Sequence, residues 1–201
     1  SYPMALSAIS FFLMQSTDVL FISAYDTFDS VAYYSIAVKL ASVTALALIS
    51  VNIVIAPKIA TIYNDKNFYE LKSILKKATR INVVISLPII IVLLCFSEYI
   101  LSTFGINYVL AKSALWVLLI AQFFNSVTGP SALYLNMTGR QKKLNVILLI
   151  SLLINIVLNI ILVPAYGMLG AAISTTASFI ISKILASALV LYLDNVKTFI
   201  S

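Results

Sequence analysis

Long apolar runs without charge alternate with short polar stretches along this chain. Charge-free runs cover residues 40–57, 81–97, 113–139 and 144–182. A helix that crosses a membrane needs about 20 mostly apolar residues. The last run is long enough for two such helices, and its Pro164-Ala165-Tyr166-Gly167 segment predicts a turn between a helix ending near Val163 and one beginning near Met168.

The first segment, Tyr2 to Tyr25, is also mostly apolar, although it holds Gln15 and Asp18. It lacks the basic region and small-residue cleavage site of a signal peptide, so we interpret it as a further span. The pattern therefore predicts an all-α polytopic membrane protein with six transmembrane helices. The expected spans are about 3–25, 30–56, 81–103, 110–137, 143–163 and 168–193, with a polar, non-spanning segment at 58–80.

The composition agrees with a membrane protein and disfavours catalysis. Of the 201 residues, 62% are hydrophobic and 10% are charged, whereas soluble domains are about 25% charged. The chain has no histidine, which excludes zinc sites with imidazole ligands and His-based triads. Cys95 lies inside an apolar run, where a small core residue is expected. We therefore expect no enzyme activity, no catalytic residue, no metal and no cofactor.

The basic residues predict the orientation. Six alternating helices place the second, fourth and final connections on one side, and the opposite connections contain Lys112 beside the acids Asp26, Asp29 and Glu98. By the positive-inside rule, both termini are expected to be cytoplasmic, and the net charge of +6 reflects topology and not nucleic-acid binding. The first side holds ten of the thirteen basic residues: Lys58, Lys66, Lys72, Lys76, Lys77, Arg80, Arg140, Lys142, Lys143 and Lys197.

The polar segment 58–80 has the pattern of a short amphipathic helix. Asn67 followed by Glu70 is typical of a helix N-cap, and an apolar stripe of Phe68, Leu71, Leu75 and Ala78 follows at helical spacing. One interpretation is a helix in the cytoplasmic interface, with this stripe in lipid and its basic residues near anionic headgroups. A solvated helical linker is the other. The interfacial basic residues are Lys66, Lys72, Lys76, Lys77 and Arg80.

Small and neutral polar residues form stripes within the spans. A four-residue ladder of small side chains favours close helix packing, and it consists of Gly170, Ser174, Ser178, Ser182 and Ala186. Two further stripes, Ser151-Asn155-Asn159 and Gln122-Ser126-Gly129, are open to two interpretations, a cavity lining or a packed interface. The amides Gln122, Asn125, Asn155 and Asn159 are candidate cavity residues.

Three ionisable residues lie within the expected spans. Asp18 and Lys39 are about 10 and 14 Å below the outer surface of neighbouring helices, at 1.5 Å per residue. Charges at such depths tend to face the bundle interior and find partners. We therefore expect Asp18 and Lys39 to face inward and to pair, with a structural and a transport role both open. Lys183 is some ~15 Å from the cytoplasmic end of its span.

Several segments, in order, resemble the second half of the polysaccharide flippases. These are the O-antigen and capsule repeat-unit exporters (Wzx type) of the multidrug/oligosaccharidyl-lipid/polysaccharide exporter superfamily. The similar segments are "APKIATIYNDKNFYELKSILKKATR", "FGINY", "LLIAQFFNSVTG", "YLNMTGRQKK" and "LNIILVPAYGMLGAAIST". Individually they are weak signals, but their order and spacing cover nearly the whole chain.

The resemblance implies one of two six-helix halves that face each other across a central cavity. The implied cargo is a polyprenyl-pyrophosphate-linked oligosaccharide, moved across the bacterial cytoplasmic (inner) membrane for lipopolysaccharide or capsule assembly. The implied partners are this cargo, membrane lipids, a missing N-terminal six-helix half and the polysaccharide polymerase machinery. Lys183 would then face the cavity and attract the pyrophosphate or acidic sugars. The alternative is a multidrug or cation antiporter of the same superfamily, with Asp18 as its coupling acid.

Overall fold

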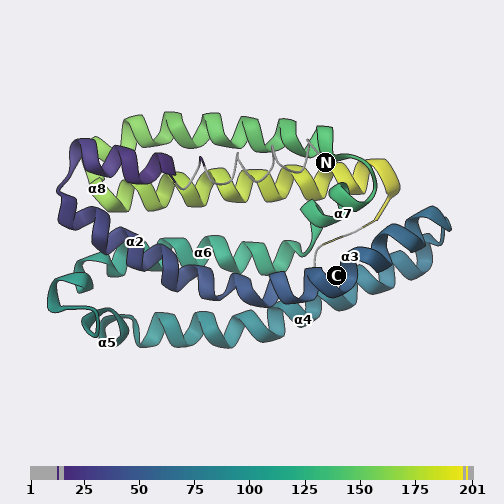
Figure 1. Ribbon diagram of the computed structural model, residues 1–201, viewed down its shortest axis with the longest axis horizontal. Helices are drawn as coiled ribbons and strands as arrows, with labels where there is room; N and C mark the ends of the chain where they lie inside the picture. Colours follow the sequence, from purple (N-terminus) through teal and green to yellow (C-terminus); the bar gives the residue numbers. More distant parts are fainter. Residues whose placement is uncertain (1–12, 14–15, 197, 199–201) are drawn as a thin grey trace.

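The computed structural model describes all residues except 1–12, 14–15, 197 and 199–201. The side chain of Ala47 is also not described. Residues 16–25 are helical, and no strand occurs in the described part of the chain. The architecture is therefore all-α (Figure 1). The elements that follow are α2 (Phe28–Val43), α3 (Ala45–Asn64), α4 (Phe68–Cys95), α5 (Ser97–Ser102), the 3-10 helix η1 (Ile106–Ala111), α6 (Lys112–Thr128), α7 (Ser131–Met137) and α8 (Gln141–Asp194).

The longest helix, α8, is folded back on itself at Gly167. The backbone there has φ 55° and ψ −134°, a non-helical conformation with the positive φ that glycine adopts most readily. A Cβ at this position would also lie 2.5 Å from the carboxylate of Asp26. The two arms of α8 consequently run side by side (Figure 1), which confirms the turn predicted at Pro164–Gly167.

The small-residue ladder allows the arms to approach closely. Its members are all buried, and a Cβ on Gly170 would overlap the backbone carbonyl of Leu162 on the other arm. The hydroxyls of Ser174 and Ser178 donate to the carbonyl oxygens of Gly170 and Ser174, at 2.9 and 2.8 Å. These serines satisfy their own hydrogen bonds within the helix, so their short side chains pack as apolar ones would. The predicted close packing is confirmed at this point.

Three of the expected spans contain breaks that the hydropathy pattern does not reveal. The span expected at 30–56 is divided between α2 and α3 at Thr44, and residues 28–43 and 48–64 are bent by 48°. The span expected at 81–103 is interrupted at Phe96. The span expected at 110–137 is interrupted at Gly129-Pro130, because Gly129 has φ 62° and proline has no N–H to continue a helix.

Several elements have the length and composition of membrane spans. Within the described residues these are α4, the segment 106–128 and α8, and a fourth is possible if the bent pair α2 and α3 is one span. Because α8 folds back at Gly167, each of its arms reaches the length of about 20 residues that a span requires. The protein is thus a helical, multi-pass membrane protein.

The segment 58–80 does not form a separate helix. Residues 58–64 complete α3, a turn follows at Asp65–Asn67, and α4 continues from Phe68 to Cys95 without interruption. The predicted N-cap is confirmed, because the Asn67 side chain accepts from the Glu70 N–H at 3.2 Å and donates to the Glu70 carboxylate at 2.9 Å. The expected interfacial helix is therefore corrected to the tip of an α3–α4 helical hairpin.

The apolar stripe of this segment faces protein and not lipid. Leu71, Leu75 and Ala78 are at most 2% exposed, while Phe68 is 37% exposed. The three buried residues share a core cluster with residues of α3 and α7, such as Ile59 and Tyr134. A hairpin buries such a stripe because two antiparallel helices offer each other an apolar surface, so lipid is not needed to cover it.

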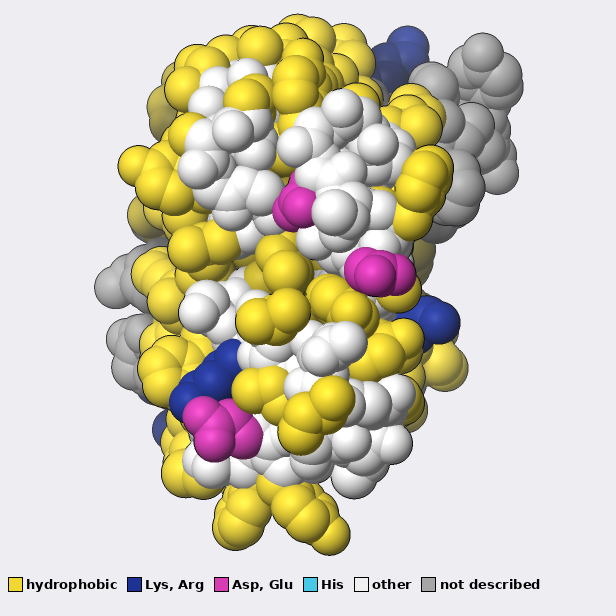
Figure 2. Space-filling view, turned by 90° about the vertical axis from the view of Figure 1, so that its left-hand side faces the viewer, with side chains coloured by type: hydrophobic (Ala, Val, Ile, Leu, Met, Phe, Trp, Pro, Cys, Tyr) yellow, Lys and Arg dark blue, Asp and Glu magenta, His cyan; other side chains and the backbone are white. Residues whose placement is uncertain are grey.

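Basic residues gather at one end of the bundle. The α3–α4 turn, α7 and the end of α8 lie toward one end (Figure 1), and the lysines of segment 58–80 and Arg140 belong to these elements. The other end contains α5 and the fold of α8. Figure 2 faces that end and shows few charged side chains among hydrophobic and uncharged polar ones. An ion pair between Glu98 and Lys112 joins α5 to α6 there.

The chain after α8 turns back into the bundle. Asn195 has the left-handed φ of 53°, and Val196 and Thr198 are buried. The Thr79 hydroxyl donates to the Thr198 carbonyl oxygen at 2.8 Å. The backbone at Gly129 passes so close that a Cβ there would overlap the Thr79 hydroxyl and lie 2.7 Å from the same Thr198 oxygen.

Gly129→Ala is therefore expected to destabilise the protein more than Gly139→Ala. Both glycines have positive φ, which costs about 1 to 2 kcal/mol for alanine, but nothing lies within 4 Å of a Cβ at Gly139. Overpacking at Gly129 should add about 1 to 3 kcal/mol. Thermal unfolding of the two purified variants in detergent measures the difference, and equal losses would show that the contact with Thr79 and Thr198 is not tight.

Candidate functional site

A buried carboxylate inside the bundle is the centre of the candidate site. Asp18 is 1% exposed and accepts hydrogen bonds from the Tyr34 hydroxyl at 2.7 Å, from Asn159 Nδ2 at 2.8 Å and from Asn155 Nδ2 at 3.3 Å. The Thr175 hydroxyl donates to the same carboxylate. All four partners are neutral, so the carboxylate is held by directed hydrogen bonds and not by a cation.

Four helical segments bring these side chains together. Asp18 belongs to the helical stretch 16–25, and Tyr34 to α2. Asn155 and Asn159 lie one helical turn apart on the first arm of α8, and Thr175 lies on its second arm. The Thr175 hydroxyl also accepts from Asn155 at 3.1 Å. The fold at Gly167 is what places donors from both arms on one carboxylate.

A cavity of about 520 Å³ opens beside this carboxylate. Its lining combines apolar side chains with neutral polar ones, and the described lining contains one acid and one base, Asp18 and Lys39. The lining residues are Ser16, Asp18, Val19, Leu20, Tyr34, Ser35, Val38, Lys39, Ala41, Ser42, Leu118, Ala121, Gln122, Thr175 and Phe179.

The amides expected at the cavity are divided between its wall and the packed interior. Gln122 lines the cavity, and its side-chain oxygen accepts from Asn125 Nδ2 at 3.3 Å. Asn125 is 6% exposed and does not line the cavity, and Asn155 and Asn159 are fully buried behind Asp18. The amide pair on α8 thus forms a packed interface that holds the acid at the cavity wall.

The two intramembrane lysines occupy different environments. Lys39 lines the cavity, whereas Lys183 is absent from its lining and lies 5.4 Å from the centre of the Phe179 ring, over its face. Phe179 itself lines the cavity, so Lys183 is one side chain removed from it. Gln15, expected one turn from Asp18, lies outside the described residues.

The expected ion pair between Asp18 and Lys39 is not formed. The ion pairs of the described residues are Glu98–Lys112 and Arg140–Asp194. Asp18 receives its hydrogen bonds from neutral donors, which fill the positions that a lysine would need. Lys39 and Asp18 nevertheless line the same cavity, so an anion and a cation border one polar space.

The oxygen atoms around Asp18 are suited to a proton or a small hard cation. Carboxylate, amide and hydroxyl oxygens are the ligand types that such cations prefer. The side-chain oxygen of Asn159 is buried and has no hydrogen-bond partner in the described structure, whereas Asn159 Nδ2 donates to the carboxylate. A group of three or more His, Cys, Asp or Glu side chains that could hold a metal does not occur among the described residues.

The sequence of the chain matches a known protein family. A profile of the MatE family matches residues 3–161, which include the Asp18 site up to Asn159. The chain belongs to the MatE family. The resemblance inferred from the sequence segments is thereby confirmed.

The chain is similar to two proteins that are named as a transporter and a flippase. The chain is 30% identical over 159 residues to a Shigella flexneri protein named "Putative O-antigen transporter", covering 78% of this chain and 37% of that protein. It is 26% identical over 184 residues to the Haloferax volcanii protein named "Probable low-salt glycan biosynthesis flippase Agl15", covering 90% and 38%. The chain therefore spans less than two fifths of the length of either relative.

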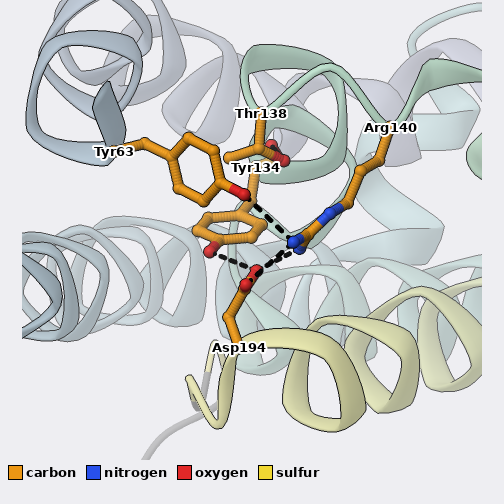
Figure 3. A network of polar contacts seen from close by, with 5 residues as sticks. All are labelled: Tyr63, Tyr134, Thr138, Arg140 and Asp194. Carbon is orange, nitrogen blue, oxygen red and sulfur yellow. Dashed lines mark hydrogen bonds and ion pairs between the residues drawn. The ribbon is translucent and has the colours of Figure 1, made fainter. Parts of the chain in front are cut away.

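A second polar cluster of this MatE-family chain lies at the basic end of the bundle. Arg140 Nη2 donates to Asp194 Oδ1 at 2.8 Å and to the Tyr63 hydroxyl at 3.0 Å, and Arg140 Nη1 contacts Asp194 Oδ2 (Figure 3). The Tyr134 hydroxyl donates to Asp194 at 2.7 Å, and the Thr138 hydroxyl donates to the Tyr134 carbonyl oxygen at 2.8 Å. The cluster joins α3, α7 and both ends of α8.

In this cluster the positive charge of Arg140 is paired with the carboxylate of Asp194 and is therefore not available to a ligand. Hydrogen bonding to the Asp194 carboxylate raises the pKa of Arg140 above its ordinary value, so the guanidinium stays charged. Its planar fork is matched by the two carboxylate oxygens, and Arg140 Cζ lies over the Tyr63 ring, 5.6 Å from its centre. Tyr134, Thr138 and Arg140 all belong to the segment "YLNMTGRQKK". Tyr63 and Asp194 lie 77 and 54 residues from Arg140, too far away in the sequence to be identified with this segment. We assign the cluster a structural role.

Asp18→Asn is expected to destabilise the protein more than Tyr34→Phe. Tyr34→Phe removes one hydrogen bond, at about 1 kcal/mol, whereas an amide at position 18 turns its NH₂ toward buried donors and costs about 2 to 4 kcal/mol. Thermal unfolding in detergent measures both variants. Equal stability losses would contradict the view that the carboxylate organises the four segments.

Proposed function

We propose that this chain forms one lobe of a flippase that translocates a polyprenyl-pyrophosphate-linked oligosaccharide for surface polysaccharide assembly. The observation that carries the proposal is the cavity of a MatE-family chain, whose described lining combines apolar and neutral polar side chains with one lysine and one buried acid. The names of the two relatives, an O-antigen transporter and a glycan biosynthesis flippase, support the same class of cargo.

The chemistry of the cavity matches such a cargo. Sugar hydroxyls need neutral hydrogen-bonding partners, and Ser35, Ser42 and Gln122 supply them at the wall. A pyrophosphate needs a cation, and Lys39 is the basic residue in the described lining. The apolar part of the lining would lie along the less polar faces of the cargo. A purely apolar cavity would suit a drug-like cation better.

Asp18 would couple transport to a proton or cation. A bound proton or monovalent cation would remove the net charge of the buried carboxylate and change its hydrogen bonds to α2 and to both arms of α8. Such a change would act on four helical segments at once. The geometry of the site supports this role, which is independent of which sugar is carried.

The complete transporter would contain a second six-helix half that closes the cavity from the other side. In this arrangement the chain contributes six spans, both termini are cytoplasmic and the membrane is the bacterial inner membrane. The gathering of lysines at the end with the α3–α4 turn supports this orientation. Membrane lipids and the polysaccharide polymerase machinery would be further partners.

Deletion of the gene that encodes this chain is expected to abolish the surface polymer. Lipid-linked repeat units should then accumulate on the cytoplasmic leaflet, since synthesis continues while translocation stops. Polymer is measured by gel electrophoresis of surface polysaccharide, and lipid-linked units by extraction and mass spectrometry. A deletion strain with normal surface polymer and altered drug sensitivity would favour the multidrug or cation antiporter instead.

Lys39→Gln is expected to lower surface polymer more than Lys183→Gln when each variant is returned to the deletion strain. Both changes remove one positive charge from the membrane interior, but only Lys39 lines the cavity. Membrane levels of the two proteins, measured by immunoblot, serve as the control. A larger loss for Lys183→Gln at equal protein level would show that Lys183 and not Lys39 meets the cargo.

A further inference from the structure

A second, smaller hollow lies between the two helices of the α3–α4 hairpin, beside the core cluster that contains Ile55 and Ala78. Its volume is about 230 Å³, and its lining is apolar except for two lysines. The lining residues are Val51, Val54, Ile55, Lys58, Ile74, Lys77, Ala78 and Ile81. It shares no lining residue with the cavity beside Asp18.

Both lysines lie in the half of the groove nearer to the hairpin turn, where Ile74 also lies, and the far end of the groove is apolar. Lys58 and Ile74 lie nearer to the turn of the hairpin at Asp65–Asn67, whereas Val51 and Ile81 lie further along α3 and α4. At 1.5 Å per residue, Val51 is about 10 Å further from the turn than Lys58. The groove thus runs from charged to apolar side chains in the direction that leads into a bilayer.

Both lysines are free to bind an anion. Lys58 and Lys77 are exposed and take part in neither of the ion pairs of the described residues. No acidic residue is among the described residues that line the groove, and the Glu70 carboxylate of the same hairpin is hydrogen-bonded to Asn67. Two cations from different helices therefore border one apolar groove without a negative partner among the described residues.

We propose that this groove binds an anionic phospholipid of the surrounding bilayer. Its phosphate would lie at Lys58 and Lys77, and one acyl chain would follow Val51, Val54 and Ile81. Basic pockets between transmembrane helices on the cytoplasmic side bind anionic headgroups by this combination of charge and apolar surface. The site is separate from the cavity and does not depend on the proposed cargo. It would hold the two helices of the hairpin together at the membrane surface.

Native mass spectrometry of the detergent-purified gene product that contains this chain tests the site, with phosphatidylglycerol and phosphatidylcholine as probes. Phosphatidylglycerol should bind in preference to phosphatidylcholine. Each lysine near an anionic headgroup is worth a roughly fivefold change in affinity, so Lys58→Gln/Lys77→Gln should weaken phosphatidylglycerol binding about 25-fold. The matched control is Lys72→Gln/Lys76→Gln, which removes the same charge from exposed positions of α4 outside the groove and should leave this binding unchanged.

A third variant separates a lipid from a free phosphate. Val54→Trp fills the groove at a side chain that is 60% exposed, so it leaves both lysines and the core in place. It should reduce phosphatidylglycerol binding, and free pyrophosphate should not compete with the lipid in the unmodified protein.

Four results would overturn the proposal. These are equal losses in the groove and control pairs, equal binding of phosphatidylcholine, full binding by Val54→Trp, and binding of a polyprenyl phosphate at this groove in place of phosphatidylglycerol.

Discussion

The hydrogen bonds to the Asp18 carboxylate are the interaction on which the rest of this lobe depends. A hydrocarbon environment provides no water to solvate a charge, so the protein must supply every partner itself. Asp18 obtains them from α2 and from both arms of α8. This requirement accounts for the depth of the helical stretch 16–25 and for the direction in which Asn155 and Asn159 of α8 point. It also accounts for the sharp fold at Gly167, which brings Thr175 to the same carboxylate.

Features that arise from neighbouring residues could be predicted from the sequence. The fold between Pro164 and Gly167, the N-cap at Asn67 and the close packing at Gly170 each depend on local conformation or on a short repeat. The break at Gly129-Pro130 also has a local signal, but hydropathy does not register it because both residues are uncharged. Charge-free runs therefore locate apolar segments well and helix ends poorly.

Features that depend on tertiary partners could not be predicted in the same way. Asp18 and Lys39 are at similar depths in adjacent helices, which favoured an ion pair, but depth does not say which direction a side chain takes or which neutral donors compete for it. Three of the donors to Asp18 lie 137 to 157 residues away in the sequence. The stripe of α4 was likewise visible as apolar, while its partner surface on α3 and α7 was not. The candidate acid was thus identifiable, and its environment was not.

The distance in sequence between Asp18 and its partners has a consequence for how the protein is made. A ribosome adds about 5 to 20 residues per second, so Asp18 is synthesised about 10 to 30 s before Thr175. During that interval Tyr34, only 16 residues downstream, is the first of the four partners to emerge. The acid must therefore be sheltered by a short hairpin, by water or by the insertion machinery until the last two helical arms arrive. Its burial is a late event of biogenesis, and a chain that stalls before Asn155 would leave an unsatisfied charge for membrane quality control to detect.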